Sequence, residues 1–307
     1  MPLNLETVSV DVPESALEAY EAALSSVCAT VGFFRDHKSG DWRVEGVKAV
    51  GEHEAELVAA LALAAGLSGV AVEAERTPTP AEGWLARSYA SFPEQRIGRR
   101  FAVRGTHLRG PAAVGRITLT LDAGLAFGSG EHGSTRGCLR ALERVAYRAP
   151  GQARGRRILD VGTGSGILAM AAARLLRRRV LATDIEPWSV RVAEQNARLN
   201  RLGKLVRCRL ADGWRHRAVR GGCYDLVFAN ILARPLCLMA RPLATHLAPG
   251  GTAILSGLLR TQAPAVIVAH RRCGLRLERV LDEGVWRTVI VRRRMAGPAA
   301  PSRPTGV

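Results

Sequence analysis

Residues 157–168 read Arg-Ile-Leu-Asp-Val-Gly-Thr-Gly-Ser-Gly-Ile-Leu, an apolar run that passes into a glycine-rich turn. This pattern predicts a buried strand followed by a turn and a helix. Gly162, Gly164 and Gly166 lack a Cβ, so the backbone can turn sharply there and a ligand can approach it closely. A dinucleotide loop would place its third glycine at position 167, where Ile167 stands. The spacing D-x-G-x-G-x-G therefore indicates a different ligand, or a turn that binds nothing.

An acidic residue stands at the expected end of the next strand, eighteen residues after Gly166. This residue, Asp184, ends an apolar segment and precedes Pro187. A carboxylate at this place can accept hydrogen bonds from both ribose hydroxyls of an adenosine, and we predict that role for Asp184. The alternative is that it caps a helix starting near Pro187. Asp212, after the following strand, would lie near the adenine or belong to a plain turn.

An amide ends a third apolar run, residues 224–230, and a helix is expected to follow it. At the carboxyl end of a parallel strand, Asn230 would face the crevice in which such sheets bind ligands. Its carbonyl oxygen could accept a hydrogen bond from a substrate amine, so we predict it as the catalytic residue; the alternative is a helix cap. The run resembles the Asn/Asp-Pro-Pro-Tyr motif of methyltransferases that act on planar nitrogens, with Ile-Leu-Ala replacing Pro-Pro-Tyr. Because the stacking aromatic is lost, a flexible amine is the expected substrate.

From about residue 117 the chain alternates apolar strands with helices, which is typical of a mainly parallel sheet. The expected strands are 117–121, 157–161, 179–184, 206–210, 224–229, 251–256 and 285–292. The expected helices include 135–146, 166–176, 189–200 and 233–247. We therefore predict an α/β fold with a Rossmann-like, mixed and mostly parallel sheet.

The first 75 residues carry a different order of elements. The expected elements are strand 7–12, helix 14–25, strands 28–34 and 41–50, helix 52–65 and strand 69–75. This βαββαβ order defines a small ferredoxin-like α+β domain, a fold that usually binds or docks. The predicted boundaries are 1–75 for this substrate-recognition domain, 76–112 for a linker, 113–294 for the domain with the large sheet and 295–307 for a disordered tail.

The net charge of +17 is divided unevenly along the 307 residues. Residues 1–75 hold thirteen acidic and four basic residues, a net charge of −9. The remaining forty basic and fourteen acidic residues carry a net charge of +26. An acidic unit joined to a basic one suits a mixed partner, such as a basic protein lying on RNA. An arginine-rich genomic composition would explain the excess of basic residues, but it explains the acidic residues 1–75 less well.

Three features of the composition restrict the class of protein. The longest apolar stretch, residues 57–72, contains two glycines and a serine and is shorter than the ~20 residues of a membrane-spanning helix. The first charged residues, Glu6 and Asp11, are acidic, unlike those of a secretory signal. The six cysteines stand singly, without the C-x-x-C pairs of a zinc site. We expect a cytoplasmic monomer with reduced and mostly buried cysteines, and with neither a metal nor a membrane segment.

One further segment, residues 121–135, precedes the sheet and is neither a linker nor a phosphate loop. It reads Leu-Asp-Ala-Gly-Leu-Ala-Phe-Gly-Ser-Gly-Glu-His-Gly-Ser-Thr. Together with Ala-Asn-Ile-Leu at 229–232 it resembles the PrmA family, the methyltransferases of large-subunit ribosomal protein eleven, whose members carry L-D-P-G-x-A-F-G-T-G-x-H-P-T-T here. The resemblance extends to residues 83–84, 255–259 and 283–286. The D-x-G-x-G-x-G loop is likewise similar to the first motif of class I methyltransferases that use S-adenosylmethionine.

The resemblance implies a site for S-adenosyl-L-methionine, with S-adenosyl-L-homocysteine as the product. Family members bind this cofactor through the second Thr of H-P-T-T, the first glycine of the loop, the ribose acid and the Asn of A-N-I-L. The matching residues here are Thr135, Gly162, Asp184 and Asn230. Asp160, Gly164 and Phe127, which stand in the same motifs, complete the predicted cofactor-binding set.

The chain departs from the family pattern at three places. Ala123 and Gly133 stand where the family has proline, and Ser134 replaces the first threonine of H-P-T-T. Because proline restricts the backbone, we expect its loss to make the segment over the cofactor more flexible. His132 is expected to have a structural role in this segment.

By resemblance, the acceptors would be lysine ε-amines and the N-terminal α-amine of ribosomal protein eleven, free or on the ribosome, with ribosomal RNA as a further contact. Two other functions stay open. The basic part of the chain favours an RNA methyltransferase, which would be expected to carry an aromatic residue after Asn230. A ribosome-associated binding factor that has lost catalysis is the second alternative. Against this second alternative, Asp160, Gly162, Asp184 and Asn230 are all intact.

Overall fold

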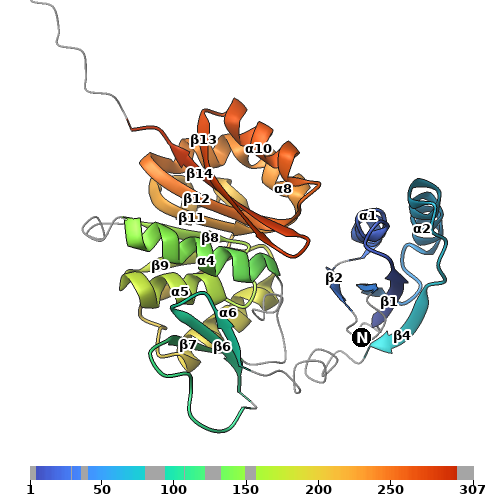
Figure 1. The fold of residues 1–307 in the computed structure, drawn as a ribbon, viewed down its shortest axis with the longest axis horizontal. Coiled ribbons are helices and arrows are strands. Elements are labelled where there is room, and N and C mark those ends of the chain that lie inside the picture. Colours follow the sequence, from blue (N-terminus) through green and yellow to red (C-terminus); the bar gives the residue numbers. More distant parts are fainter. Residues whose placement is uncertain are drawn as a thin grey trace, which may run out of the picture. The chain divides into compact units, whose positions relative to one another are not determined.

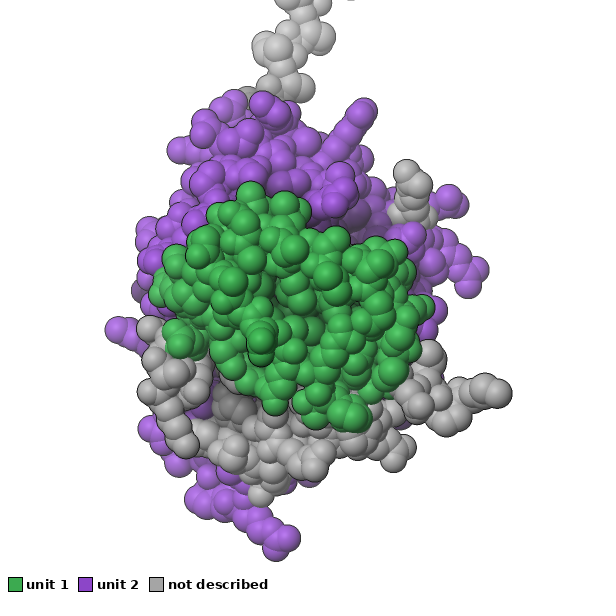
Figure 2. All heavy atoms as spheres, turned by 90° about the vertical axis from the view of Figure 1, so that its right-hand side faces the viewer, with its two compact units in different colours: residues 1–88 green, residues 89–307 purple. Residues whose placement is uncertain are grey.

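The chain divides into two compact units, residues 1–88 and 89–307, which Figure 2 draws in separate colours. The structure is a computed structural model. It describes residues 5–28, 30–35, 41–79, 94–106, 108–121, 133–148 and 157–295. Within these ranges, no helix is long and apolar enough to cross a membrane.

Unit 1 is a four-stranded antiparallel sheet with two helices (Figure 1). Its elements are β1 (Leu5–Val12), α1 (Leu17–Val27), β2 (Thr30–Arg35), β3 (Trp42–Ala49), α2 (Glu54–Ser68) and β4 (Glu75–Thr79). The strands lie in the order β2-β3-β1-β4, so the chain has the expected βαββαβ arrangement. The last strand was expected over 69–75, but α2 continues to Ser68 and ends at Gly69 with φ +69°. The chain therefore reaches the edge of β1 only at Glu75.

The core of unit 1 follows the two-residue period of β1. Val8, Val10 and Val12 are at most 1% exposed, because alternate side chains of a strand point to one face. Two large side chains of α1, Tyr20 and Leu24, are buried as well. The helices cover this face of the sheet, as the amphipathic pattern of α1 predicts.

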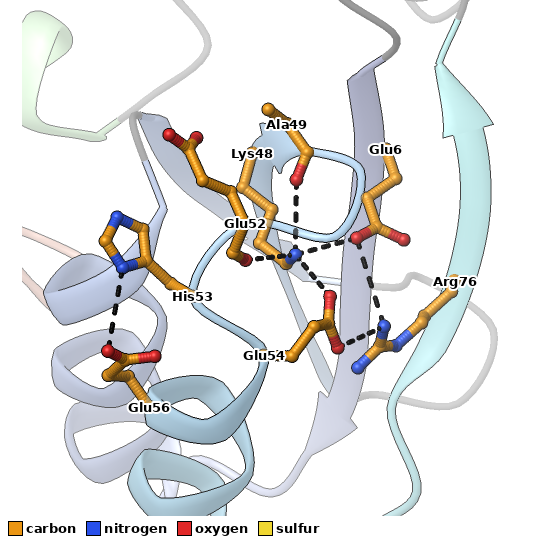
Figure 3. Close-up of polar contacts among 8 residues, drawn as sticks. All are labelled: Glu6, Lys48, Ala49, Glu52, His53, Glu54, Glu56 and Arg76. Atoms are coloured by element: carbon orange, nitrogen blue, oxygen red, sulfur yellow. Dashed lines mark hydrogen bonds and ion pairs between the residues drawn. The ribbon is translucent and has the colours of Figure 1, made fainter.

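A buried lysine joins α2 to the sheet of unit 1 (Figure 3). The Lys48 ammonium donates to the carbonyl oxygens of Ala49 at 3.3 Å and Glu52 at 2.6 Å, and to Glu54 Oε1 at 2.6 Å. It also forms an ion pair with Glu6 Oε1 at 2.8 Å. Arg76 of β4 contacts Glu54 at 2.8 Å and so extends the cluster to the edge strand. Buried charges are tolerated when they are paired and hydrogen-bonded in this way.

Unit 2 contains a seven-stranded sheet in the order β10-β9-β8-β11-β12-β14-β13 (Figure 1). The strands are β8 (Ile158–Val161), β9 (Val180–Asp184), β10 (Val206–Leu210), β11 (Tyr224–Asn230), β12 (Leu247–Leu259), β13 (Leu275–Glu283) and β14 (Trp286–Arg293). The first five are mutually parallel, and only the pairs that include β14 are antiparallel. The predicted mixed and mostly parallel sheet is confirmed, although β13 was not expected.

Helices cover both faces of this sheet (Figure 1). On one face lie α4 (Gly133–Arg148), α5 (Ile167–Leu176) and α6 (Pro187–Leu199), and on the other lie α8 (Ala233–Leu238), α9 (Ala240–His246) and α10 (Ala263–Arg272). Two short elements, η1 (Gly213–Arg215) and α7 (Arg217–Arg220), connect β10 to β11. The sequence pattern predicted one helix over 233–247. The structure breaks it at Met239, since Pro242 cannot donate a hydrogen bond to Leu238.

A separate three-stranded sheet precedes the large one. It consists of β5 (Gln95–Ile97), β6 (Phe101–Gly105) and β7 (Ile117–Leu121). Strand 117–121 was predicted with the right bounds, but it pairs with β6 and does not join the large sheet. The segment 76–112, expected as a linker, contains β5, β6 and most of β4. The expected tail lies outside the described residues, apart from Met295.

Candidate functional site

The predicted site residues gather at the carboxyl edge of the large sheet. Asp184 ends β9, the glycine loop follows β8, and Asn230 ends β11, and these three strands are neighbours. After β8 the chain adds β9 and β10 on one side, whereas β11 lies on the other side of β8. Open α/β sheets bind ligands at the carboxyl ends of the strands where the strand order reverses in this way.

The loop after β8 is built from glycines that the backbone requires. Gly162 has φ +68°, and a Cβ there would lie 2.4 Å from Ile231 Cγ2, next to Asn230. Gly166 has φ +81°, and a Cβ there would lie 3.1 Å from Ala193 Cβ on α6. Both positions combine a left-handed backbone with a close neighbour, so a side chain would push the loop out of place.

The carboxylate of Asp184 is attached to this loop. Asp184 Oδ2 accepts a hydrogen bond from the Gly164 N–H at 2.9 Å, and Oδ1 accepts one from the Glu186 N–H at 3.0 Å. The alternative role as cap of the following helix is not what the structure shows. The N-cap of α6 is Glu186, two residues later. The structure thus brings Asp184 and Gly164 together, as the sequence analysis expected.

Asp160 lies beneath the loop with no exposed surface. Its Oδ2 accepts from the Thr163 hydroxyl at 2.7 Å and from the Ala169 N–H at 3.1 Å. Its Oδ1 is buried and has no hydrogen-bond partner among the described residues. The pKa of Asp160 is raised to about 7, mainly by burial and to a lesser degree by the nearby Asp184, while the hydrogen bonds from Thr163 and Ala169 oppose the shift.

Asn230 contacts the N-terminus of α4. Its Nδ2 lies 3.4 Å from Oγ1 of Thr135, a fully buried residue in the first turn of α4. Its carbonyl Oδ1 is buried and has no hydrogen-bond partner in the described part of the chain. The alternative role as a helix cap is not observed, because Leu232 is the N-cap of α8.

Two hydroxyl residues support this corner and were not singled out by sequence analysis. The Ser256 hydroxyl on β12 lies 3.2 Å from the Ser134 carbonyl oxygen and 2.9 Å from Thr288 Oγ1 on β14. Both residues are at most 1% exposed. The sequence could have indicated them, because each is a hydroxyl residue within an otherwise apolar strand and buried polar groups need partners. Together they join the N-terminus of α4 to two strands.

Gly133, which stands in place of the family's proline, is closely packed. A Cβ there would lie 2.6 Å from the Glu283 carbonyl oxygen and 2.7 Å from Trp286 Cδ1. Helix α4 therefore begins against the β13–β14 hairpin. Phe127, Ala123 and His132 lie outside the described residues, so their predicted roles remain predictions.

Metal ligation finds no support in the described ranges, which contain no group of three or more His, Cys, Asp or Glu residues placed to hold an ion. Of the six free cysteines, only Cys138 and Cys208 are buried, so the expectation of mostly buried thiols is wrong. The site therefore consists of a glycine loop, carboxylates and an amide. The mostly parallel seven-stranded sheet that carries this set at its carboxyl edge has the fold of the class I methyltransferases.

Comparisons with known proteins identify the family within that class. The family model of the ribosomal protein L11 methyltransferases (PrmA) matches residues 8–294. A ribosomal protein L11 methyltransferase of Bradyrhizobium diazoefficiens is 47% identical over 69% of this chain and 71% of its own length. The relative from Caulobacter sp. (strain K31), with the same name, is 40% identical over 84% of this chain and 85% of its own length.

A solved structure agrees with these relatives. The ribosomal protein L11 methylase of Lactobacillus delbrueckii subsp. bulgaricus has 31% sequence identity and a TM-score of 0.59. The match covers 66% of this chain and all of that one. The chain belongs to the ribosomal protein L11 methyltransferase (PrmA) family.

Proposed function

We propose that this protein transfers methyl groups from S-adenosylmethionine to amines of ribosomal protein L11, namely lysine ε-amines and the N-terminal α-amine. The observation that carries the proposal is the carbonyl oxygen of Asn230, which is buried beside the loop of Gly162 and has no hydrogen-bond partner among the described residues. A buried acceptor without a partner costs about 1–3 kcal/mol, so its presence favours a donor that arrives with the substrate. The names of the relatives support ribosomal protein L11 as that substrate.

The residues at the carboxyl edge fit S-adenosylmethionine. Each oxygen of the Asp184 carboxylate accepts one backbone N–H and retains a lone pair for a ribose hydroxyl. Gly162 and Gly164 would hold the amino acid end of the cofactor, and Thr135 would contact it from α4. Asp160 acts by fixing the loop from below through Thr163 and Ala169. Phe127 belongs to this set by resemblance alone.

The chemistry requires positioning more than acid–base catalysis. When bound, the cofactor supplies an electrophilic methyl group on a sulfonium. Asn230 Oδ1 accepts a hydrogen bond from the acceptor amine and so orients the nitrogen lone pair for in-line attack. A lysine amine must first lose its proton, and burial next to a positive charge favours the neutral form. Because the amide of Asn230 does not titrate, it can accept in the same way from the N–H of a primary amine and of a singly methylated amine, without changing charge.

The alternative of RNA methylation is disfavoured by the residues after Asn230. A flipped base is usually held between aromatic side chains. Here the next two residues are Ile231 and Leu232, and neither can stack on a base. The alternative of a binding factor without catalysis is disfavoured by the intact contacts among Gly164, Asp184, Thr135 and Asn230.

Unit 1 would recognise the substrate. Residues 1–75 carry a net charge of −9, and an acidic surface attracts a basic ribosomal protein. Such attraction weakens as salt screens it over the Debye length of ~8–10 Å at 0.10–0.15 M. Unit 1 would thus dock the substrate, and the site in unit 2 would carry out the methyl transfer.

The decisive experiment uses labelled S-adenosylmethionine with free ribosomal protein L11 and, separately, with dissociated ribosomal subunits. We expect label in the ribosomal protein, on the α-amine and lysine amines, as mass spectrometry of its peptides would show. Label in RNA would support the alternative enzyme, and no label despite cofactor binding would support a factor without catalysis.

A second experiment tests the division of labour. Deleting residues 1–79 removes β1 to β4 and should leave cofactor affinity unchanged while methylation of ribosomal protein L11 is lost. Undiminished kcat/KM of the truncated chain for that protein would show that unit 1 has another purpose.

A further inference from the structure

A groove opens at the amino edge of the large sheet, opposite to the edge that carries Asn230. It has a volume of about 930 Å³. Its walls come from the amino ends of β8 and β9, most of β10, the last turns of α6 with the loop after it, and α7. Parallel strands have all their carboxyl ends at one edge, so none of the predicted cofactor residues lines this groove.

The groove is strongly basic. Its charged lining residues are Arg157, Arg179, Arg198, Lys204, Arg207, Arg209, Arg217 and Glu194. The single carboxylate, Glu194, is already engaged by Arg198 at 3.4 Å. Of the cations, all but Arg209 are exposed, and the structure gives Arg179, Lys204 and Arg207 no ion-pair partner in the described ranges.

The local sequence explains why the groove exists. β10 is the edge strand, and it alternates Val206 and Cys208, which are buried, with Arg207 and Arg209, which face the groove. The connection from β10 to β11 contains only η1 and the four-residue α7, so no long helix covers this part of the sheet. Arg157 lies with its guanidinium 5.5 Å from the centre of the Tyr224 ring, which restricts its position.

The cations that line the groove destabilise the folded state, because like charges close together repel one another. Arginine binds phosphate oxygens through paired N–H donors, and lysine binds them as a point charge. The cations at the starts of three adjacent strands form a row about 10 Å long, since strands lie ~4.8 Å apart. A row of this kind matches a chain of phosphates better than one small anion.

We propose that this groove is a docking surface for RNA, which it holds through the phosphate backbone and without methylating it. The groove and Asn230 lie at opposite ends of strands about 13–17 Å long, at ~3.3 Å per residue. RNA held there is therefore remote from the methyl-transfer site. The choice of RNA over another polyanion rests on the proposed function, which places the substrate among ribosomal components; the basic groove stands independently of it.

The test compares two triple variants of the full-length protein. The groove variant carries Arg179→Gln, Lys204→Gln and Arg207→Gln, which lie outside the methyl-transfer site. The matched control carries Arg271→Gln, Arg272→Gln and Arg276→Gln, three exposed residues on α10 and β13. Both variants lose the same net charge. Equal thermal unfolding midpoints and equal cofactor affinity would show that both are folded.

Binding is measured by the fluorescence anisotropy of a labelled 20-nucleotide RNA at several salt concentrations. We expect the groove variant to lose at least about tenfold in affinity, with the slope of log K against log[salt] flatter by about 2, at ~0.7 per phosphate contact. The control should lose less than about threefold. A variant with Arg179→Lys and Arg207→Lys should keep most of the affinity, since the charges remain.

Three outcomes would overturn the proposal: wild-type RNA affinity in the groove variant, an equal loss in the control, or equally tight binding of polyglutamate to the wild-type groove. Methyl transfer to free ribosomal protein L11 is measured in parallel and should be the same in all variants. Absent transfer in every protein would count against the proposed function alone.

Discussion

Each unit of this protein buries an ionisable side chain whose charge is opposite in sign to the net charge of the unit. The two side chains differ in how many of their polar atoms have partners. Unit 1 is acidic and buries Lys48. The Lys48 ammonium has four oxygen partners: the carbonyl oxygens of Ala49 and Glu52 and the carboxylates of Glu54 and Glu6. Unit 2 is basic and buries Asp160, one of whose oxygens has no partner among the described residues. Nearby, Asn230 Oδ1 is in the same condition.

The difference separates a structural cluster from a binding site. A buried charge whose partners are all present stabilises one arrangement of its neighbours. Removing it is destabilising, because its former partner stays buried as an unpaired charge. Buried acceptors without partners are costly, and they persist where a ligand or a reaction needs them. We therefore expect changes at Lys48 to act on stability, and changes at Asp184 and Asn230 to act on binding and catalysis.

The largest expected effect is on the stability of unit 1. Lys48→Ala removes the nearer cation of the buried Glu6 carboxylate, at 2.8 Å, and among the described residues leaves it only Arg76 at 3.9 Å. The loss should cost about 3–5 kcal/mol in the free energy of unfolding. Hydrogen exchange of amides in β1 and β3 would measure the loss. The matched control is Arg76→Ala, whose partly exposed ion pair should be worth no more than about 1 kcal/mol. Similar losses for both variants, or weaker cofactor binding in Lys48→Ala, would break the comparison.

The next effect concerns the ribose ligand. Asp184→Ala should weaken S-adenosylmethionine binding by about 1.5–3 kcal/mol, because hydrogen bonds to a charged acceptor are lost. Calorimetric titration measures this affinity. Asp225→Ala serves as the control, since that carboxylate accepts the Arg157 N–H at the amino edge at 2.8 Å. Unchanged affinity in a folded Asp184→Ala protein would remove this residue from the site.

A smaller and more selective effect is expected at Asn230. Asn230→Ala should slow methyl transfer by about tenfold to a hundredfold more than it weakens cofactor binding, because the acceptor amine loses its orientation. Single-turnover rates and equilibrium binding, measured on the same preparation, separate the two. Asn230→Asp, which retains an acceptor oxygen, should recover part of the rate. Equal losses in rate and binding would make Asn230 a cofactor ligand only.

The smallest effect is a pH dependence. Because the pKa of Asp160 rises from 3.8 to about 7, the folded state holds this proton where the unfolded state has lost it. The free energy of unfolding should therefore fall as pH rises from about 4 to about 7, and Asp160→Asn should lack this contribution. Denaturant titrations across that range should show the difference between wild type and variant changing by at least about 1.4 kcal/mol, the equivalent of one pKa unit. A pH-independent difference would contradict the assignment.

Sequence patterns were sufficient for the elements whose signals are local. Strand β10 and the glycine loop were predicted because a period of two and a glycine spacing are properties of adjacent residues. The predicted Asp184 and Asn230 also lie together, since both end parallel strands and such strands end at one edge. Strand β13 was missed because its residues Leu275–Glu283 mix polar and apolar side chains on a half-exposed edge.

The residues alone thus determined most strands of the large sheet, the polar residues at their carboxyl ends and the acidic and basic division of the chain, because these depend on local pattern and composition. Tertiary structure decided what each polar group contacts. Ser256 and Thr288 meet only because β12 pairs with β14, and Arg179 and Arg207 share a groove only because α7 is too short to cover β10. Whether a buried Lys48 or Asp160 is satisfied depends likewise on partners distant in sequence, which no local pattern specifies.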